Sequence, residues 1–191
     1  MNKLTVIGVV IILVVIGVSG YILVNNIHFD NKNTGNTNTN ESVKMLTISK
    51  GGVTVNYPSN WVLSRATSNS SIIAISKENA VDSREIGQIN INVEKKEFSG
   101  DFNTFVNQSY TNIKADSSFK LVSSGEATVN NEKALQYIYT SNSTAGALKQ
   151  HKSLWFERGN EAYVITYSAP VDKYDTNLPA ADYIISNIKI N

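Results

Sequence analysis

The chain has 191 residues, of which 41% are hydrophobic and 17% are charged. This length suits one globular domain with an appendage, because two domains would each have a small core. The formal net charge is only +1, so we expect no basic surface of the kind that binds nucleic acid. The chain has no cysteine, which excludes disulfides, thiolate metal sites and cysteine nucleophiles.

The N-terminal segment is long and apolar enough to cross a membrane. Residues 4–24 contain no charged side chain, and a helix of this length spans the roughly 30 Å hydrocarbon core of a bilayer. Lys3 precedes them, which favours a cytoplasmic N-terminus. We therefore expect residues 1–24 to anchor a single-pass protein in the cell membrane. The alternative is a signal peptide cleaved at Gly20, and both interpretations place the remainder outside the cytoplasm.

A linker rich in Asn and Thr follows over residues 25–42. It has too few apolar side chains to offset the entropy cost of ordering, so we expect a flexible tether of roughly 25 Å average span. Residues 43–191 then form the extracytoplasmic domain.

Alternating apolar and polar residues predict three hairpins in this domain. Their turns lie at Gly51-Gly52, Asn130-Asn131 and Arg158-Gly159-Asn160, which are residues that turns favour. A further strand with one apolar face is predicted within residues 88–98. The pattern therefore predicts an antiparallel sheet.

Two helices are predicted to cover the sheet. The first spans residues 101–115, where Asp101 or Ser99 can cap the first turn. Its apolar stripe comprises Phe102, Phe105, Val106, Ser109 and Ile113. The second spans residues 177–190, where Pro179 suits the first turn, and its stripe comprises Ala181, Ile184, Ile185 and Ile188. We expect an α+β fold, an antiparallel β-sheet covered by helices and preceded by one transmembrane helix.

The order of these elements resembles the PsbP-like family. A strand ends in Tyr57-Pro58, Trp61 follows three residues later, and a β-ribbon, the helix beginning DFNTFV, two long hairpins and a C-terminal helix come next. The resemblance covers about residues 45–191 and is greatest to membrane-anchored PsbP-related proteins of methanogenic archaea and similar microbes. It implies an α/β/α sandwich, a fold shared with a Ran-binding nuclear import factor. A photosynthetic role does not follow, because fold does not imply function.

Trp61 has two interpretations. Pro58 lacks a backbone donor and so ends its strand, after which Trp61 can fold back over the edge of the core. We favour this structural role. The alternative is that Trp61 lines a ligand-binding groove, as aromatic residues do at recognition sites.

No catalytic or metal-binding motif is present. His151 is the only histidine after the linker, and no motif links it to a serine and an acid. The pairs Glu94 with Glu97 and Asp172 with Asp175 are better explained as solvated charge than as Ca²⁺ ligands or acid–base catalysts. We therefore expect a protein that is not an enzyme and has no cofactor or metal.

The favoured function is a protein-interaction or assembly module that holds another envelope or membrane protein. The candidate binding residues are Trp61, Trp155, His151, Tyr163 and Arg65, with Arg84 as a second exposed arginine. Packing beneath a helix is the simpler explanation for Trp155, His151 and Tyr163.

The alternative function is a carrier or sensor of a small hydrophobic ligand. In that case an unfilled cavity would lie between sheet and helix, lined by Tyr57, Tyr137, Tyr139 and Phe105. An unfilled pocket above roughly 300 Å³ would reverse the preference for the interaction module.

Overall fold

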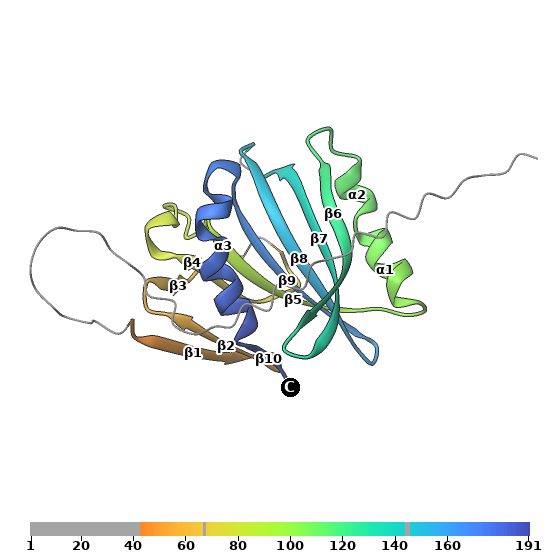
Figure 1. Cartoon of the computed structure of the whole chain (residues 1–191), viewed down its shortest axis with the longest axis horizontal. Coiled ribbons are helices and arrows are strands. Elements are labelled where there is room, and N and C mark those ends of the chain that lie inside the picture. The colour runs from red at the N-terminus through yellow and green to blue at the C-terminus, as the bar shows by residue number, and fades with distance from the viewer. Residues whose placement is uncertain (1–42, 67, 144–145) are drawn as a thin grey trace, which may run out of the picture. The chain divides into compact units, whose positions relative to one another are not determined.

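The computed structural model describes residues 43–191, except for 67 and 144–145. The predicted anchor at residues 1–24 and the linker at residues 25–42 lie outside the described residues. Within the part that the structure describes, no helix is long and apolar enough to cross a bilayer. Two antiparallel sheets and three α-helices make up most of the described chain (Figure 1).

The smaller sheet joins both ends of the domain. It has the strand order β1-β2-β10, with bounds β1 (Met45–Lys50), β2 (Val53–Pro58) and β10 (Ile188–Ile190). The predicted hairpin at Gly51-Gly52 is confirmed, since both glycines have positive φ and β1 pairs antiparallel with β2. Ile188 of β10 pairs with Val55, which joins the last strand to the first hairpin of the described domain.

The larger sheet has seven strands in the order β3-β4-β5-β9-β8-β7-β6, and all neighbours are antiparallel. The bounds are β3 (Trp61–Leu63), β4 (Ser71–Lys77), β5 (Asn90–Glu97), β6 (Lys120–Val129), β7 (Glu132–Asn142), β8 (Leu148–Arg158) and β9 (Glu161–Pro170). The hairpins predicted at Asn130-Asn131 and Arg158-Gly159-Asn160 are confirmed as β6–β7 and β8–β9. Strands β3 and β4 were not among the predicted elements.

The first predicted helix is confirmed but divides into α1 (Phe102–Ser109) and α2 (Thr111–Lys114). Of the two candidate caps, Asp101 is the one that caps α1, because its Oδ1 accepts a hydrogen bond of 2.7 Å from the backbone N–H of Thr104. A short 3₁₀ helix, η1 (Glu78–Ala80), follows β4.

The prediction for the last helix was wrong at both ends. Helix α3 (Val171–Ser186) begins directly after β9, so Pro179 lies inside the helix rather than in its first turn. The helix ends at Ser186, and residues 188–190 pair with β2 instead of continuing it. Pairing with an open strand edge satisfies the backbone groups of these residues, which local helical periodicity cannot anticipate.

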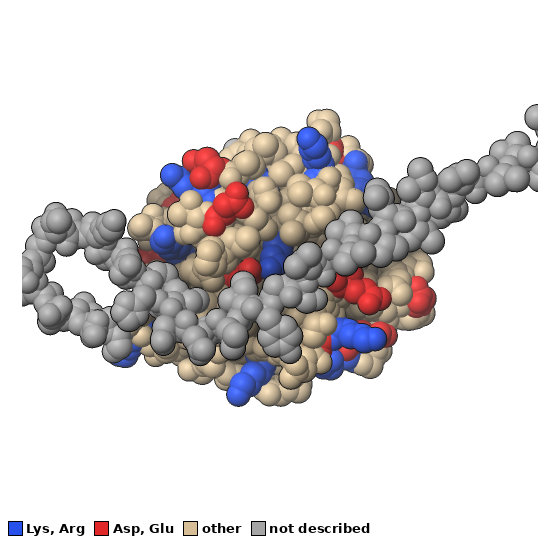
Figure 2. All heavy atoms as spheres, viewed as in Figure 1, with Lys and Arg blue, Asp and Glu red and all other residues tan. Residues whose placement is uncertain are grey.

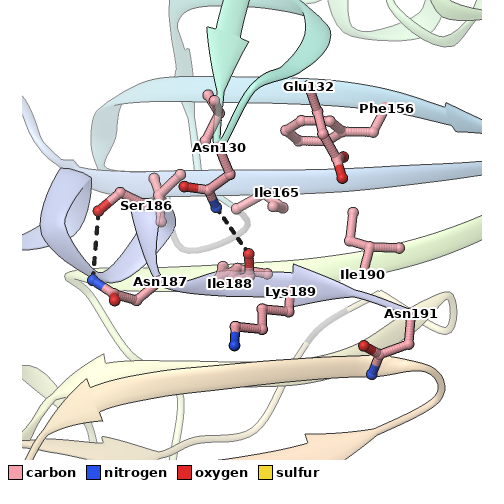
Figure 3. Close-up of a pocket in the computed structure, with 12 residues that line it drawn as sticks. Asn130, Glu132, Phe156, Ile165, Ser186, Asn187, Ile188, Lys189, Ile190 and Asn191 are labelled. Carbon is pink, nitrogen blue, oxygen red and sulfur yellow. Dashed lines mark hydrogen bonds between the residues drawn. The ribbon is translucent and has the colours of Figure 1, made fainter.

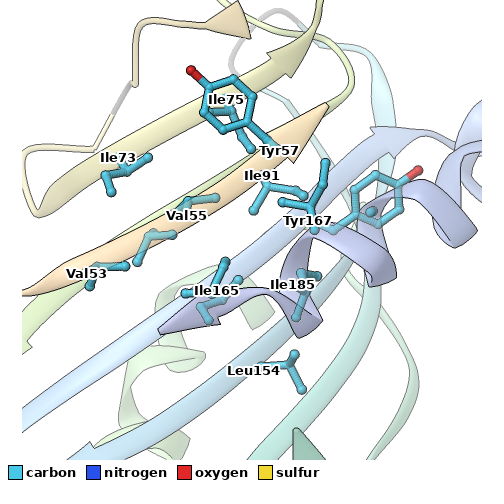
Figure 4. Close-up of a cluster of buried hydrophobic side chains, with 14 of the residues drawn as sticks. Val53, Val55, Tyr57, Ile73, Ile75, Ile91, Leu154, Ile165, Tyr167 and Ile185 are labelled. Carbon is cyan, nitrogen blue, oxygen red and sulfur yellow. The ribbon is translucent and has the colours of Figure 1, made fainter. Parts of the chain in front are cut away.

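The seven-stranded sheet has an apolar cluster on each face. On the first face, which we call the α3 face, Ile75, Ile91 and Ile165 pack against Ile185 of α3 and against Val55 of the small sheet (Figure 4). On the opposite face, which we call the α1 face, the cluster comprises Val106, Tyr110, Tyr139, Trp155, Ala162 and Val164. Helices therefore cover both faces of the sheet. Charges of both signs are interspersed over the side that Figure 2 shows.

Candidate functional site

Three hollows on the described surface have volumes of about 410, about 370 and about 320 Å³. The largest lies where the end of α3, β10 and the β6–β7 turn meet (Figure 3). The second lies beside the start of α1, over β7 and β8. The third, which we call the sheet groove, lies on the α1 face of the seven-stranded sheet, and its lining comprises residues of β4, β5, β7, β8 and β9, of segments 64–66 and 84–88, and Ser143.

The largest hollow has a mixed lining of apolar and polar residues. Its lining includes Phe156, Ile165 and Ile188, but the protein already buries all three side chains. The remaining lining is mostly polar, and Asn130 Nδ2 donates a hydrogen bond of 3.0 Å to the carbonyl oxygen of Ile188 across the hollow (Figure 3). Its volume exceeds the roughly 300 Å³ expected of a carrier, and its lining combines the partly buried Val129 and Ile190 with polar side chains.

The sheet groove, by contrast, presents a row of polar side chains across adjacent strands. Asn90 of β5 pairs with Ser168 of β9, Ser168 pairs with His151 of β8, and His151 pairs with Tyr139 of β7. Side chains of directly paired residues lie on the same side of a sheet, so the register alone places all four in the groove. The row is fixed by four hydrogen-bonded strands and needs no loop to form.

His151 is held firmly in the wall of the groove. Its Nε2 lies 3.1 Å from Oγ of Ser141, its Nδ1 lies 2.8 Å from Oγ of Ser168, and its ring stacks on Tyr139 with 4.8 Å between ring centroids. Burial, together with the positive charge of Lys149, lowers the pKa of His151 to about 4. The imidazole is therefore neutral near pH 7, with both nitrogens engaged by serine hydroxyls.

Lys149 lies in the same lining, next to His151 along the same face of β8. Only 6% of this residue is exposed. Burial lowers the pKa of its ammonium group, and the charge of Asp82 partly opposes that effect. Among the described residues, no hydrogen bond or ion pair is formed by Nζ of Lys149.

Two other cations line the groove, and they differ in their pairing. Arg84 forms an ion pair of 2.8 Å with Asp82. Arg65 is exposed and forms no ion pair within the described part of the chain. The one acidic residue of the lining, Glu94, pairs with a lysine outside it, Lys96, at 2.9 Å. The groove therefore presents the positive charges of Arg65 and Lys149 without an anion bound to either.

The structure brings together only two of the five candidate residues named from the sequence. His151 and Arg65 both line the sheet groove. Trp61 is 1% exposed and belongs to the cluster on the α3 face, where Tyr163 also lies at 3% exposure. Trp155 is 4% exposed beneath α1, and its Nε1 donates a hydrogen bond of 2.8 Å to the hydroxyl of Tyr110. These three aromatic side chains are part of the packed interior.

The side chains expected to line a ligand cavity instead pack against other side chains. Tyr57 belongs to the cluster on the α3 face. Tyr137 stacks on Tyr110 with 4.4 Å between ring centroids, and Phe105 meets Trp155 edge-on at 6.2 Å. Of the predicted set, Tyr139 alone borders a hollow, since its ring lines the sheet groove.

Sequence reasoning missed Lys149 and the amide side chains of the groove. Asn90 and Asn92 alternate with buried isoleucine and valine in β5, and such alternation reads as a strand with one solvated face. These polar positions hold amides rather than charged residues, and that choice was the one feature of the sequence that could have indicated a binding surface. No feature of the sequence indicated Lys149, because its burial depends on the neighbouring strands.

Two common catalytic arrangements are not formed by the described residues of the groove. No carboxylate of the described residues hydrogen-bonds to His151, so the serine–histidine contacts lack the acid of a catalytic triad. Within the same residues, no group of three His, Asp or Glu side chains is placed to hold a metal ion. Amides, hydroxyls and two unpaired cations are instead groups that bind a polar or anionic partner.

Solved structures similar to this chain include two with a TM-score above 0.5. Cyanobacterial PsbP from Synechocystis sp. PCC 6803 is 12% identical over 83% of this chain and 99% of its own, with a TM-score of 0.54. LpqN of Mycobacterium tuberculosis, described as involved in cell envelope biogenesis, is 17% identical over 78% of this chain and 91% of its own, with a TM-score of 0.53. The Ran-binding protein Mog1p of Saccharomyces cerevisiae has a TM-score of 0.48, with 12% identity over 78% of this chain and 96% of its own.

No curated protein matches the sequence. The model of the family described as PsbP-like protein matches residues 5–190. The resemblance drawn from the order of elements is thereby confirmed, and the chain belongs to the PsbP-like family.

Proposed function

We propose that this protein is a non-catalytic binding or assembly module, anchored in the cell membrane by residues 1–24, that binds another envelope protein through the sheet groove. The observation that carries the proposal is the polar row across β5, β9, β8 and β7. A site built on paired strands keeps its side chains in place before a partner arrives, which lowers the entropy cost of binding.

The location outside the cytoplasm is supported by the sequence and by one fold neighbour. Residues 4–24 have the length and apolar character of a membrane-spanning helix. LpqN, which has a similar fold, is described as involved in cell envelope biogenesis. At 17% identity this likeness is one of fold. An envelope role for this chain is therefore a proposal that the experiments below test.

A crosslinking experiment tests the binding role. The full-length protein is produced in its own cells with a photoreactive amino acid at Asn92, which lines the groove, or at Tyr183, which is exposed on α3. We expect a discrete crosslinked species with one envelope protein from position 92 only. Identical products from both positions, or none from position 92, would contradict a docking role for the groove.

A fractionation experiment tests the anchor. We expect the full-length protein in the membrane fraction, with residues 43–191 open to protease added to intact cells, and we expect a chain lacking residues 1–24 to lose membrane association. The mass of the mature protein distinguishes an uncleaved anchor from a signal peptide cleaved at Gly20. Protection of the domain from protease would contradict the proposed location.

A carrier of a small hydrophobic ligand is the second candidate, and the volume of about 410 Å³ in the largest hollow is the observation that favours it. Native mass spectrometry of the protein purified from its own cells, compared with the denatured mass, tests it. A small-molecule mass that denaturation releases would support the carrier function. A bare protein mass would leave the binding module as the better account.

A further inference from the structure

Lys149 is mostly buried, yet its ammonium group has no partner among the described residues. Lys149 is among the few buried charged or polar residues of the described chain. Its stem is packed between neighbouring strands, while its ammonium nitrogen is not a buried atom and reaches the solvent of the sheet groove. A charge held in such a partly desolvated position is usually paired in proteins. Lys149 has no such pair among the described residues, although its side chain lines the sheet groove.

Neighbouring groups of the protein do not supply the missing contact. Asp82 is close enough to favour the charged form of Lys149, but its carboxylate already accepts hydrogen bonds from Arg84, including one of 2.8 Å to Nη2. His151 is the next residue along the same face of β8, and both of its ring nitrogens are within hydrogen-bond distance of serine hydroxyls. The ammonium group therefore lacks an acceptor that an incoming anion would provide.

We propose that the Lys149 end of the sheet groove binds a carboxylate of an acidic segment of the partner protein, with Arg65 contacting a second acidic residue of that segment. This inference rests on the proposed function, because it specifies the chemistry of the docking segment. Lys149 supplies a charge-assisted hydrogen bond from the wall of the groove, and Arg65 supplies an exposed charge elsewhere in the same lining.

The charges of the lining fit single carboxylates better than a phosphate. Lys149 and Arg65 each offer one positive charge to a separate carboxylate. Glu94 lies in the same groove and is paired with Lys96, so among the described residues no second free cation stands beside Lys149 in that part of the lining. The rest of the lining consists mainly of neutral amides and hydroxyls, among them Asn90, Asn92 and Thr166. Such groups can form hydrogen bonds with the backbone of an extended peptide, at positions between its acidic residues.

The test is a titration of the full-length protein, in detergent micelles, with a capped heptapeptide of sequence Gly-Ser-Asp-Glu-Asp-Ser-Gly. The matched control peptide replaces its acids by Asn and Gln, and inorganic phosphate is titrated separately. Backbone amide shifts in a ¹H–¹⁵N spectrum locate the binding. We expect the acidic peptide to shift resonances at residues 149–151 and 65, and the neutral peptide to leave them unchanged.

Variants then assign the effect to Lys149. Lys149→Met keeps the aliphatic stem without the charge and should weaken peptide binding by roughly ten- to hundredfold, as loss of a charged hydrogen bond does. Lys173→Met is the control, since this lysine is exposed on α3. A well-dispersed spectrum shows that each variant is folded. Equal binding by Lys149→Met, shifts outside the groove, or a Lys149-dependent response to phosphate alone would overturn the inference.

The outcome also separates this inference from the proposed function. If crosslinking from position 92 persists in Lys149→Met and peptide binding is unchanged, the groove docks a partner by other contacts and the inference fails alone. If the peptide depends on Lys149 but position 92 crosslinks to nothing in cells, the carboxylate site stands and the proposed function fails.

Discussion

Two neighbouring tyrosines on the α3 face differ in what their hydroxyl groups contact. The hydroxyl of Tyr167 donates a hydrogen bond of 2.9 Å to the backbone carbonyl of Tyr174. The hydroxyl of Tyr174 is the one buried side-chain polar atom without a hydrogen-bond partner among the residues that the structure describes. A buried polar group without a partner destabilises a fold, whereas a satisfied one contributes modestly to stability.

Replacing each tyrosine by phenylalanine should therefore have different effects. We expect Tyr167→Phe to lower the free energy of unfolding by about 1 kcal/mol, since it removes a formed hydrogen bond. Tyr174→Phe should leave that free energy unchanged or raise it, because it removes a hydroxyl that has lost its water. Urea denaturation of the two variants measures the difference. Equal destabilisation by both would show that the hydroxyl of Tyr174 has a partner in solution.

His151 should make the stability of the domain depend on pH. The folded-state pKa of about 4 lies below the ordinary value of 6.5, so protonation favours the unfolded chain. The free energy of unfolding should therefore fall as the pH drops from 6.5 to about 4, by on the order of 2 kcal/mol. Denaturant unfolding at several pH values measures this slope.

The matched variant for this prediction is His151→Gln, which keeps hydrogen-bonding capacity and cannot titrate. It should show a flatter profile between pH 6.5 and 4. Carboxylates whose pKa is held low by hydrogen bonds, such as Asp101 and Asp116, act in a different range. They lose their contribution only as the pH falls below about 4. An unchanged slope in the variant would contradict the burial of His151.

At the scale of elements, the segment between β4 and β5 depends on one glycine. A Cβ atom at Gly87 would lie 1.7 Å from Oγ and 2.4 Å from Cβ of Ser76, a fully buried residue of β4. Ser76 cannot easily move aside, because its hydroxyl donates a hydrogen bond of 2.7 Å to Oγ of Ser64. Gly87 also lines the sheet groove, so its close approach shapes the candidate site.

Gly87→Ala should therefore destabilise the domain by about 1–3 kcal/mol, as overpacking of a buried contact does. The control is Gly125→Ala in β6, where an added Cβ meets no atom within 4 Å. We expect the control to be neutral or slightly stabilising, because alanine restricts the unfolded chain. Thermal unfolding of both variants, and of Gly87→Ala combined with Ser76→Gly, completes the test. The double variant should recover part of the loss.

At the scale of the whole molecule, the two apolar clusters are built on opposite sides of the same strands. Leu154 and Phe156 of β8 belong to the cluster on the α3 face, and Trp155 between them belongs to the cluster on the α1 face. If these strands unfold, the apolar side chains of both clusters become exposed to water. The described domain should therefore unfold as one cooperative unit.

The two tryptophans of the chain report on this directly, because Trp61 lies in one cluster and Trp155 in the other. Trp61→Phe and Trp155→Phe each leave one fluorescent reporter. In each variant we expect the fluorescence midpoint in urea to coincide with the midpoint from circular dichroism of the same variant. A separated midpoint in either variant would show that one layer unfolds before the other.

Much of the architecture follows from the sequence by itself. Three hairpins were predictable from the alternation of apolar and polar residues on either side of Gly51-Gly52, Asn130-Asn131 and Arg158-Gly159-Asn160. Turn residues and strand alternation depend only on residues close together in the sequence. The capping of the first helix by Asp101 and the interior position of Trp61 followed from equally local rules.

Other features were decided only by the tertiary structure. Residues 188–190 became a strand because β2 offered an open edge, and Lys149 became buried because β7 and β9 flank it. The groove exists because the register aligns Asn90, Ser168, His151 and Tyr139, which lie far apart in the chain. Contacts between distant segments depend on how whole elements pack, so no local pattern could have placed these residues together.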